Sequence, residues 1–226
     1  INEGFIKLVF DKVLGKKIET PFLRLPYRDA MDRFGSDKPD MRFGMELTDI
    51  SGEVRGCGFK VFDGALENGG SVRCINAEGL APEMKRKKLD SYVEFVKTFR
   101  AKGLAWIAVE EDGLRSQVTK FLSEETIDKI LKKTGAKVGD CLLIVADKNQ
   151  VVYDALGSLR IKVAEDFDII DKSKFNFLWV TEFPLFEYSE EEERFVAKHH
   201  PFTSPMDEDI EKLDTEPENV RAKAYD

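Results

Sequence analysis

The chain has 226 residues, of which 42% are hydrophobic and 35% charged, and its formal net charge is −8. Such a composition is typical of a soluble globular protein, and no apolar run approaches the roughly 20 residues that span a bilayer. The negative charge excludes a general electrostatic attraction to nucleic acid, so any RNA contact needs a local basic patch. The three cysteines lack CxxC spacing and predict reduced thiols in a cytoplasmic protein: Cys57, Cys74 and Cys141.

The first 48 residues open with a helix. Phe5, Val9 and Val13 recur every four residues and give that helix an apolar face, which ends near Gly15. An extended stretch, a two-turn helix and a polar turn are predicted next, over about 21–26, 27–34 and 35–42.

Residues 49–171 change to a compact pattern in the order β-β-α-β-α-β-α. Glu67 to Gly70 has the residues of a hairpin turn between the first two strands. We expect a sheet with helices on one face, which is a two-layer α+β domain. The predicted strands are about 58–66, 71–77, 104–109 and 141–146, and the helices about 83–102, 118–133 and 151–165.

From residue 172 the chain becomes β-prone again. Residues 177–188 predict a strand with a bend at Pro184, and 195–200 predict its partner in an antiparallel hairpin. Residues 201–219, which hold three prolines and many acids, predict a loop. We therefore expect the flanks 1–48 and 172–226 to form one structure, with 49–171 inserted as a complete folding unit.

Both ends predict a piece of a larger protein. Ile1 leads directly into the amphipathic pattern without a capping residue. Residues 220–226, VRAKAYD, have the pattern of half a strand with nothing after it.

His199 and His200 are the only histidines. On the predicted strand their side chains point to opposite faces, so the pair is poorly placed to bind one metal ion. An imidazole that faces a cleft is a good partner for a carboxylate. The alternative is two surface histidines before a proline, and the residues alone leave both interpretations open.

The densest basic cluster is Lys85, Arg86, Lys87 and Lys88, near the start of the predicted helix 83–102. The helix dipole disfavours cations at that end, which suggests a phosphate partner such as an RNA backbone. A solvated helix face is the competing interpretation. No phosphate-binding loop, nucleophile elbow or metalloprotease pattern occurs in the sequence.

Three stretches resemble the bacterial-type aspartyl-tRNA synthetases. GSDKPDMRFGMELT at 35–48 is the first, FLWVTEFPLFE at 177–187 the second, and AKHHPFTSP at 197–205 the third and most specific. They occur in the order of that family, and the gap between the first two is where the family carries an insertion.

The resemblance implies a class II antiparallel catalytic sheet, partly contained in 1–48 and 172–226. It also implies that the insertion, 49–171, is a GAD domain of two-layer α+β fold. An enzyme of this family condenses L-aspartate with ATP, accompanied by Mg²⁺, and transfers the aspartyl group to tRNA. The first histidine of the HHPFT motif helps to recognise aspartate, which implies substrate-binding roles for His199 and its neighbour His200.

The chain departs from the family pattern in four respects. The dimerisation motif, the motif 2 arginine that grips ATP, the glycine-rich motif 3 and the anticodon-reading domain are all absent from the 226 residues. The resemblance implies that the whole enzyme is a homodimer that uses ATP. The segment by itself is expected to be an inactive monomer that binds no cofactor. The alternative function is a stand-alone GAD-type module that binds tRNA or a partner without catalysis.

Overall fold

The computed structural model describes residues 1–224, which divide into two compact units. One unit is discontinuous and consists of residues 1–30 and 175–226, and the other runs from Met31 to Lys174. The borders of the predicted insertion, residues 49 and 171, lie inside the second unit and stay a prediction. The α+β class predicted from the sequence is confirmed.

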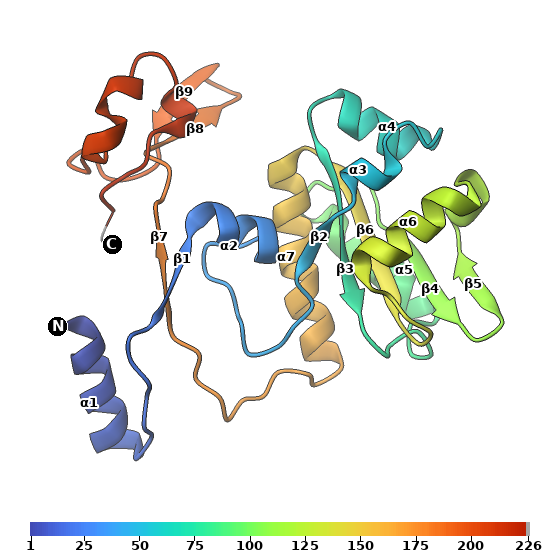
Figure 1. The fold of residues 1–226 in the computed structure, drawn as a ribbon, viewed down its shortest axis with the longest axis horizontal. Coiled ribbons are helices and arrows are strands. Elements are labelled where there is room, and N and C mark those ends of the chain that lie inside the picture. The colour runs from blue at the N-terminus through green and yellow to red at the C-terminus, as the bar shows by residue number, and fades with distance from the viewer. Residues whose placement is uncertain (225–226) are drawn as a thin grey trace. The chain divides into compact units, whose positions relative to one another are not determined.

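The unit 31–174 is built on a five-stranded sheet in the order β2-β3-β6-β4-β5, whose neighbouring strands are all antiparallel (Figure 1). The strands are β2 Leu47–Asp49, β3 Ser71–Ala77, β4 Ala105–Glu110, β5 Gly113–Ser116 and β6 Cys141–Asp147. The helical elements are α3 Ser51–Val54, α4 Lys60–Glu67, α5 Arg86–Lys97, η1 Thr119–Phe121, α6 Glu124–Thr134 and α7 Asn149–Asp166.

Helices cover both faces of this sheet, which corrects the two-layer expectation. α5 and α7 pack on one face with Leu143 and Val145 of β6, whereas α3, α4 and α6 pack on the other with Leu142 and Ile144. Every residue of β6 is buried. Continuous apolar strands are typical of sheets that are covered on both sides, and the alternation of side chains then supplies two cores.

The predicted strand 58–66 is wrong, because these residues form helix α4. Phe62 and Leu66 lie four residues apart and are its buried residues, so the helical period decides the structure. Asp63 accepts hydrogen bonds from the backbone N–H groups of Gly56 and Gly58, both at 2.9 Å, which fixes the turn before the helix. Gly69 and Gly70, which follow this short helix, are residues typical of a hairpin turn, and they led to the prediction of a strand.

The discontinuous unit contains α1 Asn2–Leu14 and two separate strand pairs. β1 Leu23–Pro26 pairs in parallel with β7 Leu178–Thr181, whereas β8 Phe186–Ser189 and β9 Arg194–Ala197 form the expected antiparallel hairpin. Glu3 joins α1 to this unit, because its carboxylate accepts from the Trp179 indole N–H at 2.8 Å and from the Phe22 backbone N–H at 3.2 Å. Within residues 201–219 the structure has two 3₁₀ turns, η2 Asp207–Lys212 and η3 Pro217–Asn219.

Helix α2, Tyr27–Phe34, ends at Gly35, and the backbone there passes very close to α7. A Cβ atom on Gly157 of α7 would lie 2.6 Å from the Gly35 carbonyl oxygen and 2.8 Å from that of Phe34. Gly35 itself has a φ of +63°, and a Cβ there would lie 2.4 Å from the Tyr153 carbonyl oxygen. Two glycines thus permit two backbones to meet at a distance that no other residue allows.

We expect Gly157→Ala to destabilise the unit 31–174 by about 1–3 kcal/mol, since the added methyl group must push backbone atoms apart. Gly64→Ala is the matched control, because a Cβ on that α4 residue meets nothing within 4 Å. The control should be neutral or stabilise by about 0.5–1 kcal/mol, as alanine favours a helix interior. Urea unfolding followed by Trp106 fluorescence in a Trp179→Phe background measures both, and equal losses of stability would contradict a close-packing role for Gly157.

Candidate functional site

The histidine pair lies just beyond the β8–β9 hairpin. Strand β9 ends at Ala197, so His199 and His200 occupy a bend instead of the strand predicted over 195–200. The Lys198 backbone N–H still donates to the Leu185 carbonyl oxygen at 3.0 Å, in the register of the β8–β9 ladder. The Leu185 N–H, however, donates to the Val220 carbonyl oxygen at 2.8 Å instead of back to Lys198, so the ladder stops there. The two imidazoles are therefore not separated by opposite strand faces, and they differ because of their own contacts.

His199 is the more constrained of the two imidazoles. Its Nε2 lies 3.1 Å from the Pro184 carbonyl oxygen, which can only accept, so Nε2 carries the proton of this hydrogen bond. The ring also meets the Phe183 ring edge to face, with centroids 5.8 Å apart. His200 is exposed, and its Nδ1 accepts from the Phe202 backbone N–H at 3.3 Å. Only His199 is therefore oriented by residues distant in sequence.

Lys198 adds a cation beside this histidine. Its Nζ donates to the Tyr27 hydroxyl at 2.9 Å and lies 4.8 Å from the centre of the Tyr27 ring. Tyr27 in turn contacts Phe183, with ring centroids 5.1 Å apart. Phe183 thus contacts both Tyr27, which bears the Lys198 ammonium, and the imidazole of His199.

A buried carboxylate holds the backbone that orients His199. Asp209 is fully buried and accepts from the Arg221 Nε at 2.7 Å, from the Arg221 backbone N–H at 3.0 Å and from the Lys212 Nζ at 2.7 Å. Arg221 also pairs with Glu182 at 3.2 Å. The hydrogen bonds from the two cations hold the pKa of Asp209 well below its usual range, and Asp209 and Glu182 raise the pKa of Arg221.

This ion pair fixes the extended segment around Arg221 against the residues before β8. The Ala222 N–H donates to the Phe183 carbonyl oxygen at 2.7 Å, and the Leu185 N–H donates to the Val220 carbonyl oxygen at 2.8 Å. Pro184, which lacks an N–H, lies between these two bonds and directs its carbonyl to His199. The position of the imidazole therefore depends on Asp209 through Arg221 and the Pro184 backbone.

We expect Asp209→Asn to lower the unfolding midpoint of the discontinuous unit at neutral pH, because a neutral amide leaves Arg221 without its buried counter-charge. Since the folded pKa lies below the unfolded value of about 3.9, the carboxylate stabilises the fold fully above that value. The contribution disappears as the pH falls further, so the acid-induced destabilisation should be smaller in the variant.

Trp179 fluorescence in a Trp106→Phe background reports on this unit. The matched control is Asp207→Asn, because Asp207 is exposed and its one ion pair among the described residues is with Lys223, at 2.6 Å. An Asp209→Asn variant whose midpoint and acid transition equal those of the control would contradict the proposed role of the buried carboxylate.

The basic cluster is divided between two environments. Helix α5 begins at Arg86 with Lys85 as its N-cap, later than the predicted start at 83. Lys88 pairs with Asp166 of α7 at 3.2 Å and lies 5.6 Å from the centre of the Tyr92 ring. Lys85, Arg86 and Lys87 are exposed, and the one ion pair that Arg86 forms within residues 1–224 is a long one with Asp90, at 3.8 Å. Three of the four cations thus face solvent and one stabilises the packing of α5 on α7.

The segment 35–46, which contains GSDKPDMR, is held by Arg160 of α7. This arginine is fully buried and donates to the carbonyl oxygens of Phe43, Gly44 and Met45, with its guanidinium carbon 4.0 Å from the centre of the Phe43 ring. Burial lowers the pKa of Arg160 to about 10. Arg160 was not predicted as a partner of this segment, because it is one of several charged residues in α7, with Asp154 and Lys162 nearby in sequence, and its position reveals nothing of its partners.

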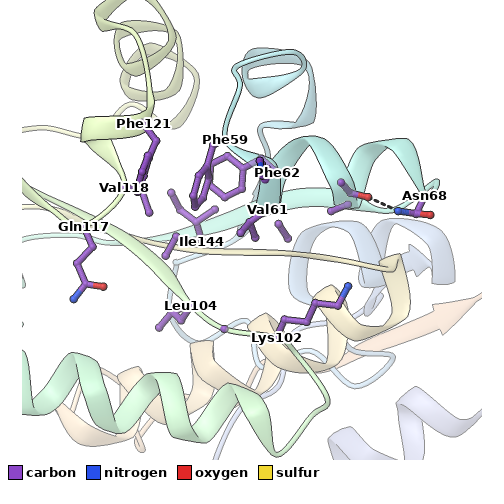
Figure 2. A pocket seen from close by; sticks show the side chains of 16 residues that line it. Phe59, Val61, Phe62, Asn68, Lys102, Leu104, Gln117, Val118, Phe121 and Ile144 are labelled. Carbon is purple, nitrogen blue, oxygen red and sulfur yellow. Dashed lines mark hydrogen bonds between the residues drawn. The ribbon is translucent and has the colours of Figure 1, made fainter.

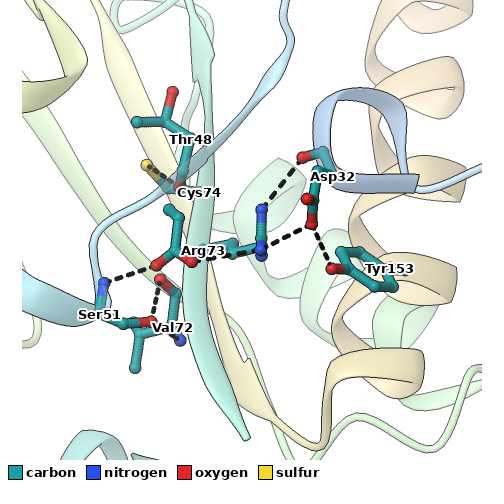
Figure 3. Close-up of polar contacts among 8 residues, drawn as sticks. Asp32, Thr48, Ser51, Val72, Arg73, Cys74 and Tyr153 are labelled. Carbon is teal, nitrogen blue, oxygen red and sulfur yellow. Dashed lines mark hydrogen bonds and ion pairs between the residues drawn. The ribbon is translucent and has the colours of Figure 1, made fainter. Parts of the chain in front are cut away.

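A second polar network ties α2 to the sheet (Figure 3). Arg73 of β3 donates to the Asp32 carboxylate at 2.9 Å and to the Asp32 carbonyl oxygen at 3.1 Å, and it pairs with Asp49 at 3.2 Å. The Tyr153 hydroxyl donates to the same Asp32 carboxylate. Burial, with the bond to Asp32, raises the pKa of Tyr153 to about 12. These contacts position the start of the segment 35–46.

Neither a metal centre nor a membrane span is found in the part of the chain that the structure describes. Among residues 1–224, no three His, Cys, Asp or Glu side chains gather as a metal site. Within the same residues, no helix is long and apolar enough to cross a bilayer.

Comparisons with known proteins identify both parts of the chain. The sequence profile of the GAD domain matches residues 62–156. The aspartate–tRNA ligase of Ruminiclostridium cellulolyticum is 57% identical over the whole chain, and that of Clostridium perfringens strain 13 is 59% identical. The aspartate–tRNA(Asp/Asn) ligase of Caldanaerobacter subterraneus subsp. tengcongensis is also 59% identical over the whole chain. The chain spans 38% of the length of each of these relatives.

Proposed function

We propose that this chain, which is similar over its full length to bacterial aspartate–tRNA ligases and contains their GAD domain, is part of an enzyme that activates L-aspartate with ATP and transfers it to tRNA. The observation that carries the proposal is that the similarity extends over 100% of the chain and so includes both flanks of the GAD domain. A stand-alone binding module has no need of the flanking segments, which disfavours the alternative.

We assign the recognition of aspartate to the bend at His199 and His200. The imidazole of His199 is half-buried, is oriented by the Pro184 carbonyl group and has Lys198 beside it in the chain. An imidazole in that position can give a carboxylate a charge-assisted hydrogen bond. A group that interacts better with a carboxylate than with an amide also helps to reject asparagine. His200, which is more exposed, takes the outer position.

In the whole enzyme, we expect His199→Ala to raise the KM for aspartate by roughly 10–100-fold, which corresponds to the removal of one hydrogen bond to a charged group. His199→Gln is the companion variant, since its amide can still donate to the Pro184 carbonyl group. A role limited to holding the bend predicts rescue by glutamine, whereas a role in aspartate binding predicts that both variants are impaired. An unchanged KM and kcat in the alanine variant would refute the assignment.

We further propose that the exposed cations Lys85, Arg86 and Lys87 contact the tRNA phosphate backbone in the whole enzyme. Their exposure at the start of α5, where the helix dipole disfavours cations, supports this role. Lys88 is assigned to packing, because its ammonium group is paired with Asp166.

Replacing Lys85, Arg86 and Lys87 together with glutamine should reduce the slope of log K against log salt for tRNA binding. The expected reduction is about 0.7–0.9 for each phosphate that the three side chains neutralise in the wild type. The matched control replaces the three lysines of α6 at 129, 132 and 133 with glutamine, which removes the same charge from another helix. Equal slopes in the wild type and the α5 variant would mean that the three side chains do not contact phosphates and form a solvated helix face.

The whole enzyme and the segment are expected to differ in assembly and activity. We place the whole enzyme in the cytoplasm as a homodimer, and we expect the 226-residue segment to be a monomer. The segment lacks the motif 2 arginine that grips ATP, so it should not form the adenylate by itself.

A further inference from the structure

The helical layer on one face of the five-stranded sheet has an opening. A cleft of about 520 Å³ lies between α4 and the segment around η1, with Ile144 and Ala146 of β6 at its base (Figure 2). This volume is within the range of about 300–1,000 Å³ that small-molecule sites occupy. The cleft belongs entirely to the unit 31–174 and is remote in sequence from the histidine pair.

Aromatic rings form one wall of the cleft. Phe59 and Phe121 are nearly parallel, with centroids 5.2 Å apart and an angle of 12° between the rings. Phe62 meets Phe59 edge to face at 4.8 Å. Phe121 is 50% exposed, although aromatic side chains of this size are usually covered. Phe62 is buried and Phe59 half-buried, so the exposed part of Phe121 supplies most of the apolar surface that this wall leaves open.

A glycine keeps the cleft open from the side of α4. Gly64 lies inside this helix and lines the cleft, and a Cβ on it would meet nothing within 4 Å. Its φ is not in the left-handed region, so neither backbone conformation nor close packing requires glycine there. Glycine weakens a helix interior, and what it provides at this position is the empty volume in front of the phenylalanines.

The polar groups of the cleft are positive or neutral. Lys60, Lys102, Asn68 and Gln117 line it, and among the described residues none of its lining side chains is acidic. Lys102 and Gln117 lie across from the phenylalanines (Figure 2). Neither lysine forms an ion pair within residues 1–224. The cleft is therefore locally positive, although the chain as a whole carries a net charge of −8.

We propose that the cleft binds a small aromatic anion, with its ring against Phe59 and Phe121 and its negative group held by Lys60 and Lys102. Flat rings stack on phenylalanine faces, and an anion at the mouth can reach ammonium groups that no carboxylate of the described residues neutralises. This site shares no residue with the proposed aspartate and tRNA sites, so its failure would leave the proposed function intact.

The test uses isothermal titration of the 226-residue chain with 2-naphthoate and with its neutral counterpart, 2-naphthalenemethanol. The naphthoate should bind with at least a 5-fold preference over the alcohol. In an NMR spectrum of the ¹⁵N-labelled chain, naphthoate binding should shift the backbone amide signals of Gly64 and Gly103, because both glycines line the cleft. No binding of naphthoate at millimolar concentration, or equal affinity for the alcohol, would overturn the proposal.

Two variants locate the binding. Gly64→Leu fills the cleft and should weaken naphthoate binding at least 10-fold. Gly52→Leu is its matched control on α3, where a Cβ also meets nothing within 4 Å, and it should bind as the wild type does.

Lys102→Glu, at an exposed position, should lower the affinity for naphthoate but not for the alcohol. Unaltered binding in both Gly64→Leu and Lys102→Glu would also overturn the proposal. A third outcome would overturn it as well. If the wild type does not bind naphthoate and Gly64→Leu lowers the tRNA affinity of the whole enzyme, the cleft is an RNA-binding surface.

Discussion

Strand β6 is the constraint on which the unit 31–174 depends, because all seven of its residues are buried. Its side chains alternate between two hydrophobic cores, so each face of the sheet must be covered by helices. The long helix α7 follows β6 directly and covers one face, and it also carries Gly157 and Arg160 to the segment 35–46. The position of the GSDKPDMR segment is therefore a consequence of how α7 packs on this central strand.

The discontinuous unit is stabilised in a different way. Its hydrophobic cluster around Leu185, Val220 and Ala222 is small, and a second group of ring contacts joins Phe10 to Phe177 and Phe177 to Phe22, with centroids 5.0 and 5.2 Å apart. Short backbone pairings between distant segments add to this order. The buried Asp209 accepts from Arg221 and Lys212, which makes those pairings dependent on one ion pair. Removing one partner of a buried ion pair leaves an uncompensated buried charge, so the backbone that orients His199 depends on both Asp209 and Arg221.

The two regions also differ in how they could contact ligands. The bend at His199 has an imidazole, an ammonium and aromatic rings that belong to a polar, carboxylate-binding environment. The cleft beside α4 exposes ring faces and leaves an open space in front of a glycine. The proposed aspartate site and the proposed site for an aromatic anion therefore rest on different physical properties of the same chain.

Local patterns determined most of the elements. The helix over 27–34 and the strand over 71–77 were predicted with the bounds that the structure has. Gly35 follows the helix directly and Gly70 precedes the strand, so both borders are marked in the sequence. Helix α4 was missed, since Gly64 and the flanking glycines obscure an eight-residue helical pattern. The HHPFT motif marked the histidines, but it placed them on a strand that ends at Ala197.

Tertiary structure alone decided which partners the charged side chains have. Arg160 meets carbonyl groups more than 110 positions away, Arg73 meets Asp32 41 positions away, and Asp209 meets Arg221 across a turn. It also decided that Lys88 is paired while Lys85 faces solvent, although both belong to one basic run. A sequence records the period of an element, which sets the buried face. Partners that are far apart along the chain are set by how those faces pack, and no local pattern contains that information.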